Sequence, residues 1–77
     1  MKPIFYKVKS TNECFKLVPV DNVSKEAINN LLDAIKDEGI EFITENEFEK
    51  SHDDWMDINL FDSTNKLIAT LTTQKID

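Results

Sequence analysis

The first residues of the chain alternate between apolar and polar side chains over residues 4–9. A period of two is typical of a β-strand that buries one face, and here it places Tyr6 between two aliphatic residues on the same side. Turn-forming residues follow at 10–13. A second apolar segment at 14–20 is expected to pair with the first strand as a hairpin.

The second segment does not show which of its faces is buried. Phe15 and Leu17 project to the side opposite Val18 and Val20, so either pair suits a core. Pro19 cannot donate to a strand ladder, and its position favours an edge or an exit from the sheet.

A helix is predicted over residues 25–38. Ser24 is a suitable N-cap, and Gly39 suits the left-handed position that ends many helices. Val23 just before the cap can pack on the first turn as a hydrophobic staple. The apolar positions recur at helical spacing and are Ile28, Leu31, Leu32 and Ile35.

A short strand is predicted at 40–44, and the segment after it has two interpretations. Thr44 followed by Glu47 matches a capping box, which indicates a short helix from Glu45 to about Ser51. A loop over residues 45–54 is the alternative. The choice decides whether the acidic side chains of this segment form a line or a cluster.

A second hairpin is predicted from strands at 55–62 and 66–73 with a turn at 63–65. Apolar residues alternate with polar ones in both strands, and the apolar set is expected to face the helix. Phe61 is then expected on the outer side of its strand, close to Ile68. The inward set is Met56, Ile58, Leu60, Leu67, Ala69 and Leu71.

These elements predict an α+β fold. We expect a small, mainly antiparallel sheet of about five strands, including two hairpins, with one amphipathic helix packed on one face in the order ββαβββ. Residues 1–77 are expected to form a single compact domain. Cys14 is the only cysteine, so no disulfide can form within the chain. Without a signal peptide or an apolar segment of about 20 residues, a cytoplasmic protein is expected.

The charge of the chain is concentrated in its centre. Residues 33–62 contain eleven carboxylates and two lysines, a net charge of 2 − 11 = −9, against −6 for the whole chain. All nine basic residues are lysine, so the chain lacks the arginine forks that grip phosphates and guanine edges. A one-signed surface attracts cationic partners and repels nucleic acids and anionic membranes. The predicted partner is therefore a protein with a basic surface.

Some acidic residues occupy unfavourable positions. Asp37 and Glu38 fall in the last turn of the predicted helix, where the macrodipole disfavours anions by about 0.3–1 kcal/mol each. In extended backbone, the alternate glutamates from Glu45 onward would lie about 6.6–6.8 Å apart, close to the spacing of successive phosphates. The predicted partner-binding residues are Asp37, Glu38, Glu41, Glu45, Glu47, Phe48, Glu49, Asp53, Asp54, Trp55 and Asp57.

Two alternatives to this surface remain open. The carboxylates can form a solvated face that keeps a small protein soluble. The two aromatic residues beside them, Phe48 and Trp55, suit either core positions or anchors in a partner.

Catalysis and metal binding are not expected. His52, Asp53, Asp54 and Asp57 supply metal-binding atoms, but their spacing matches no metal-binding loop. Cys14 and His52 lie on different predicted elements, so nothing indicates a catalytic pair. The single glycine excludes phosphate-cradling loops. We expect no enzyme activity, no cofactor and no metal.

In size, charge and compactness the chain is similar to the small acidic proteins that phages and mobile elements use against host nucleases, including anti-CRISPR and anti-restriction proteins. The resemblance implies a non-enzymatic inhibitor that occupies a basic, nucleic-acid-binding surface of a host enzyme, in the manner of a nucleic-acid mimic. The alternative is an antitoxin or immunity-type partner, or a homo-oligomeric module, that binds through the hydrophobic outer face of the second hairpin. The sequence does not specify the oligomeric state.

Overall fold

The computed structural model of the chain describes residues 3–75, which form five strands and two helices. The elements in chain order are β1 (Ile4–Val8), β2 (Cys14–Pro19), α1 (Lys25–Lys36), β3 (Ile40–Phe42), α2 (Glu45–Ser51), β4 (Trp55–Phe61) and β5 (Leu67–Gln74). The strands form one antiparallel sheet in the order β3-β1-β2-β5-β4. The predicted α+β class and both hairpins are confirmed. Within residues 3–75, neither helix has the length and apolar content needed to cross a membrane.

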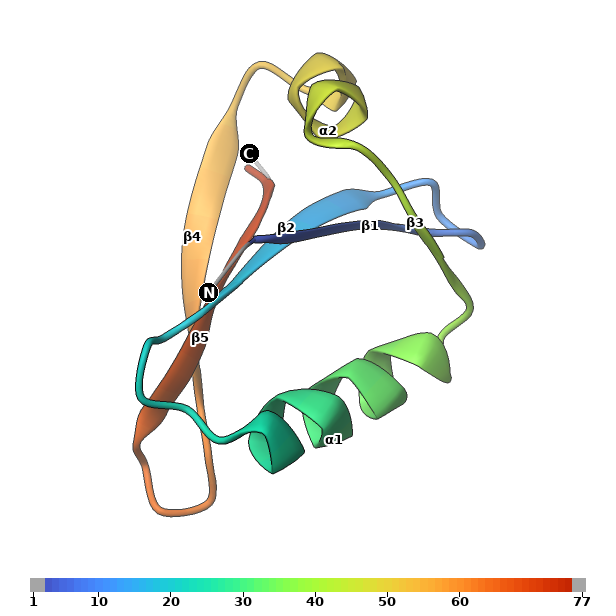
Figure 1. Cartoon of the computed structure of the whole chain (residues 1–77). Helices are drawn as coiled ribbons and strands as arrows, with labels where there is room; N and C mark the ends of the chain where they lie inside the picture. The colour runs from blue at the N-terminus through green and yellow to red at the C-terminus, as the bar shows by residue number, and fades with distance from the viewer. Residues whose placement is uncertain (1–2, 76–77) are drawn as a thin grey trace.

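The two helices lie on opposite sides of strands β1 and β2 (Figure 1). The prediction of one helix on one face is therefore incomplete, and the element order is ββαβαββ rather than ββαβββ. The register explains the two-sided packing. Tyr6 lies opposite Phe15 on the side of α1, whereas Phe5, its neighbour in β1, projects towards Phe48 of α2. The central strands therefore carry apolar side chains on both faces, and one helix packs on each face.

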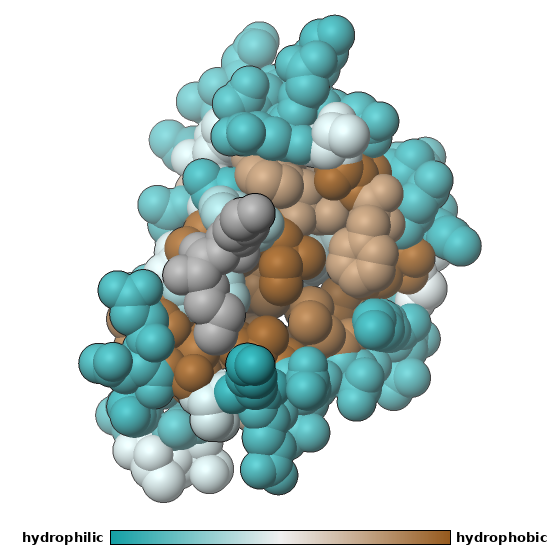
Figure 2. Space-filling model, viewed as in Figure 1, coloured by the Kyte–Doolittle hydropathy of each residue, from teal (hydrophilic) through white to brown (hydrophobic). Residues whose placement is uncertain are grey.

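The core on the α1 side is built around three strand residues, Tyr6, Leu17 and Ala69, of which Leu17 and Ala69 are fully buried. The rings of Tyr6 and Phe15 stack with their centroids 5.2 Å apart. Burial raises the pKa of the Tyr6 hydroxyl to about 12 because the apolar surroundings disfavour the phenolate. Half-buried side chains of α1 pack against this cluster, namely Leu31, Leu32 and Ile35. Figure 2 shows hydrophobic side chains gathered between the hydrophilic outer surfaces of α1 and α2.

The start of α1 is as predicted. Ser24 is the N-cap, and its hydroxyl accepts a hydrogen bond from the Ala27 N–H at 3.1 Å. One turn later, Ile28 is buried. The apolar stripe predicted from the helical period therefore faces the sheet.

The end of α1 comes at Lys36, two residues before the predicted end at 38. The N–H groups of Glu38 and Gly39 donate to carbonyl oxygens three residues earlier, both at 3.0 Å, so the last turn is tightened. Gly39 has a φ of +78°, which confirms the predicted left-handed position. The chain then turns directly into β3.

The outer part of the second hairpin differs from the prediction. Met56 and Ile58 lie on the predicted side of β4, because Ile58 pairs with Leu71 of the core, but each is 39% exposed. These two side chains remain exposed because β4 is an edge strand, whereas α1 packs over the centre of the sheet. A register shift after Leu60 also places Phe61 opposite Leu67 rather than Ile68.

The turn of this hairpin is held by one carboxylate. Asp62 Oδ1 accepts hydrogen bonds from the Thr64 N–H at 2.9 Å, the Thr64 hydroxyl at 2.6 Å and the Lys66 N–H at 3.0 Å. Asn65 takes the left-handed conformation with φ of +66°. The Thr64 hydroxyl first, and then the Lys66 N–H, lower the pKa of Asp62 below its ordinary value of 3.8.

Asp62→Asn should therefore destabilise the protein in a pH-dependent way. The folded-state pKa of Asp62 is lowered, so its stabilisation is complete above the ordinary pKa of 3.8 and is lost as the pH falls through the lowered value. Urea midpoints should be lower for the variant near neutral pH and should converge with wild type in acid. Asp53→Asn is the control, and a difference between Asp62→Asn and wild type that persisted in strong acid would contradict this role.

Candidate protein-binding surface

Helix α2 crosses the sheet face opposite α1. It follows β3 and precedes β4, which are the two edge strands of the sheet. Thr44 is its N-cap, and the hydroxyl accepts a hydrogen bond from the Glu47 N–H at 3.1 Å. The helical interpretation of residues 45–51 is thus confirmed and the loop alternative is wrong. The helix connects β3 to β4, which are not neighbours in the sheet.

Phe48 fixes α2 to the sheet. Its ring is 5% exposed and lies 5.4 Å from the ring of Phe5 in β1 and 4.2 Å from that of Trp55 at the start of β4. Trp55 is half-buried, and the His52 ring meets it edge-on at 5.5 Å. Phe48 therefore has the core position, and Trp55 remains partly exposed beside it.

The three glutamates of α2 are distributed around the helix instead of along a line. In a helix, Glu45 and Glu49 lie on the same side one turn apart, whereas Glu47 points about 200° around the axis from each. The line with phosphate-like spacing that extended backbone would produce is therefore absent from residues 45–51. All three side chains are exposed.

Asp53 and Asp54 extend this group of charges. Both are exposed in the connection between α2 and β4. We call the five carboxylates of Glu45, Glu47, Glu49, Asp53 and Asp54 the α2 acidic cluster. With Lys50 in the same segment, its net charge is 1 − 5 = −4. Among the described residues, none of the five carboxylates accepts a hydrogen bond or forms an ion pair.

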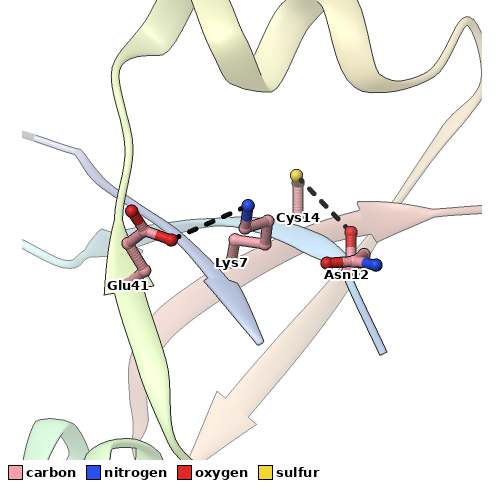
Figure 3. Close-up of polar contacts among 4 residues, drawn as sticks. All are labelled: Lys7, Asn12, Cys14 and Glu41. Atoms are coloured by element: carbon pink, nitrogen blue, oxygen red, sulfur yellow. Dashed lines mark hydrogen bonds and ion pairs between the residues drawn. The ribbon is translucent and has the colours of Figure 1, made fainter. Parts of the chain in front are cut away.

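Two other predicted carboxylates have partners inside the protein. Glu41 in β3 forms an ion pair with Lys7 of β1, with 3.7 Å between Oε2 and Nζ (Figure 3). Asp57 Oδ1 accepts a hydrogen bond from the Thr72 hydroxyl at 2.6 Å across the β4–β5 pair. The Lys7 ammonium group offsets the charge of Glu41, and the Thr72 hydroxyl occupies one carboxylate oxygen of Asp57.

Asp37 and Glu38 lie apart from the α2 acidic cluster. They follow α1, on the other side of the sheet, although both are exposed. The structure thus places five of the nine predicted carboxylates on α2 and the connection after it, ties two more to neighbours and leaves these two on the other side of the sheet.

The other candidate groups are dispersed. Cys14 is buried, and its Sγ lies 3.9 Å from the Asn12 carbonyl oxygen (Figure 3). Within residues 3–75, no three His, Cys, Asp or Glu side chains come together as metal ligands would. A small cavity of about 170 Å³ lies between the start of α1 and the β4–β5 turn, on the other side of the sheet from α2. It is lined by Asn22, Val23, Ser24, Ala27, Asp62, Lys66, Leu67 and Ile68.

Comparisons with known proteins found no matching family model, no similar curated protein and no similar solved structure.

The predicted outward position of Phe61 in β4 agrees with its exposure of 54%. Sequence reasoning did not identify the other exposed apolar residues at the sheet edges, which are Phe42 in β3 at 57% and the partly open Met56 and Ile58. The alternation in residues 55–61 indicated a strand, but only the strand order shows that its apolar side extends beyond the cover of α1. No signal in the sequence separates an edge strand from a central one here.

Phe48→Ala should detach α2 from the sheet. Replacing a buried phenylalanine by alanine costs about 3–5 kcal/mol, a large share of the stability of a domain this small. Denaturant unfolding followed by circular dichroism should show a strongly lowered midpoint, while Phe48→Leu should lose less. Glu49→Ala at the adjacent exposed position is the matched control. Equal midpoints for Phe48→Ala and Glu49→Ala would contradict the proposed role of the ring.

Proposed function

We propose that the chain is a small, non-enzymatic inhibitor that uses the α2 acidic cluster to bind a basic, nucleic-acid-binding surface of another protein. The observation that supports this most directly is the set of five exposed carboxylates that have no hydrogen-bond or ion-pair partner within residues 3–75. Charges that stabilise the fold are usually paired or hydrogen-bonded, as Glu41 and Asp62 are here. In the described part of the chain the cluster makes no such contact, so its carboxylates can meet lysines and arginines of a partner.

The electrostatics favour fast and salt-sensitive binding. Exposed charges at an interface raise the association rate more than the final affinity. Their effect is screened over a Debye length of about 8 Å at physiological ionic strength. Outside residues 33–62 the chain is mildly basic, because residues 1–32 have a net charge of +2 and residues 63–77 a net charge of +1. This asymmetry would orient the α2 side of the molecule towards a cationic groove.

The α2 acidic cluster shares the negative charge of a nucleic-acid strand but not its shape. Because Glu45, Glu47 and Glu49 are helical, their carboxylates surround α2 instead of following a line. We therefore propose that the cluster competes with nucleic acid for a basic groove without reproducing phosphate spacing. The lone free thiol, Cys14, is consistent with action in the reducing cytoplasm of a host cell.

A second candidate function is binding through the β4–β5 hairpin, as in an antitoxin or immunity-type protein. It is favoured by the exposure of Phe61, Met56 and Ile58 along one strand. This candidate does not depend on the α2 acidic cluster, so its response to salt and to charge substitutions differs.

The test is capture of basic proteins on the immobilised chain, with double-stranded DNA as the competitor. From a bacterial lysate at low salt, we expect wild type to retain nucleic-acid-binding proteins, and both added DNA and physiological salt should release them. The triple variant Glu45→Gln, Glu47→Gln and Glu49→Gln should associate about tenfold more slowly with a captured protein, measured by biolayer interferometry.

The matched control removes the same charge elsewhere. Glu13→Gln, Glu26→Gln and Asp33→Asn also change the net charge from −6 to −3, at exposed positions outside α2. Capture should survive in this control. Equal loss in both triple variants would show that total charge matters and not the α2 acidic cluster. Undiminished capture by the α2 variant, or capture unaffected by DNA, would rule out the proposed function.

A further inference from the structure

Strand β4 has a free edge among the described residues, 3–75. It pairs with β5 on one side and ends the sheet on the other, and Figure 1 shows it in the left part of the view. Its seven residues, 55–61, remain regular, because the extra residue of the register shift, Ile68, belongs to β5. An unpaired edge of this length is a template for another strand, and neither a proline nor a bulge blocks it.

The hydrogen bonding identifies the groups that point outward. The Lys75 N–H donates to the Asp54 carbonyl at 3.2 Å, so the backbone groups of Asp54 point towards β5. Because this direction alternates along an antiparallel strand, Met56, Ile58 and Leu60 also point inward. The N–H and C=O groups that face outward are those of Trp55, Asp57, Asn59 and Phe61.

The residue types of β4 are symmetric about Ile58. Reading outward in either direction gives a short polar residue, then an aliphatic residue, then an aromatic one, in the sequence WMDINLF. Ile58 itself lies on the apolar side with Met56 and Leu60. A strand with this pattern complements a second copy of itself when the two run antiparallel.

We propose that two copies of the chain pair through β4 about a two-fold axis at Ile58. Ile58 then lies opposite Ile58 of the second copy. The remaining pairs join Trp55 to Phe61, Met56 to Leu60 and Asp57 to Asn59, each in both directions. The outward-facing residues pair only with one another, giving four hydrogen-bonded pairs and about eight backbone hydrogen bonds. The two sheets become one continuous sheet, and the exposed Met56, Ile58 and Phe61 each gain an apolar cross-strand neighbour.

The polar pair on the other face of the strand is also complementary. Asp57 Oδ1 already accepts from Thr72, and Asn59 Oδ1 lies 3.5 Å from the Thr70 hydroxyl. This leaves Asp57 Oδ2 as an acceptor and the Asn59 amide N–H as a donor. The two groups lie opposite each other in the dimer, so a charged acceptor meets a donor and not a second carboxylate.

Other two-fold registers fit less well. An axis at Asp57 places two carboxylates directly opposite each other, and an axis at Asn59 pairs Asp57 with Phe61. Beyond the strand, the register about Ile58 brings Asp54 opposite Asp62. This repulsion confines the ladder to residues 55–61 and makes the dimer sensitive to salt.

The register can be tested by disulfide formation in a Cys14→Ala background. Ile58→Cys places two thiols in a non-hydrogen-bonded pair, with Cα atoms about 4.5 Å apart, which suits a disulfide. Met56→Cys alone should not cross-link, because its symmetry mate lies four residues along the ladder, about 13 Å away. A mixture of Met56→Cys and Leu60→Cys chains should cross-link to each other. Cross-linking of Met56→Cys alone as fast as Ile58→Cys would overturn the register.

Sedimentation equilibrium of the wild-type chain provides the second measurement. At about 100 µM, a dimer with a Kd of micromolar order is mostly associated. Ile58→Lys should weaken the dimer at least tenfold, about 1.4 kcal/mol, while Phe42→Lys on the opposite edge strand should not. A monomeric wild type at this concentration, or equal effects of Ile58→Lys and Phe42→Lys, would refute the proposed dimer.

Salt separates this dimer from the proposed inhibitor function. Two chains of net charge −6 repel each other, so higher ionic strength should tighten the dimer. Binding of a basic partner by the α2 acidic cluster should weaken under the same change. Failure of either test therefore leaves the other intact.

Discussion

The fold depends on the contact between Phe48 and the two aromatic rings beneath it. β3 and β4 lie at opposite edges of the sheet, so the chain must cross a whole face between them. α2 makes this crossing in two helical turns, and the stack on Trp55 and Phe5 is its attachment. Without that attachment the helix would be too short to persist, because isolated helices of fewer than about 12 residues are marginal in water. The exposed carboxylates are displayed on an element that one buried ring holds in place.

The parts of the fold that follow from neighbouring residues could be predicted. Ser24 and Thr44 cap helices as their spacing indicated, and Gly39 takes the left-handed position. Both hairpins form between the expected segments. Each of these features depends on residues a few positions apart, where backbone hydrogen bonding and turn chemistry dominate.

The parts that depend on strand order could not be predicted. The pattern of β2 fits burial of either face, and the structure shows why: Leu17 packs under α1, while the other face of the central sheet lies under α2. Met56 and Ile58 have the alternation of core residues, but their strand is at an edge. The charge of the α2 acidic cluster was evident from the sequence, whereas its geometry required the helix, since residues two apart diverge in a helix and align in a strand.

The position of β5 sets the order in which the protein can acquire its structure. β5 is the last strand within residues 3–75, yet it lies inside the sheet between β2 and β4. While the protein is being synthesised, β1, β2 and α1 leave the ribosome early but have no neighbour on the β2 side, and β4 has none at all. Joining β2 to β5 closes a loop of nearly fifty residues, an entropic barrier that slows folding. The complete sheet can therefore form only after residues 67–74 have emerged, when β5 joins β2 to β4.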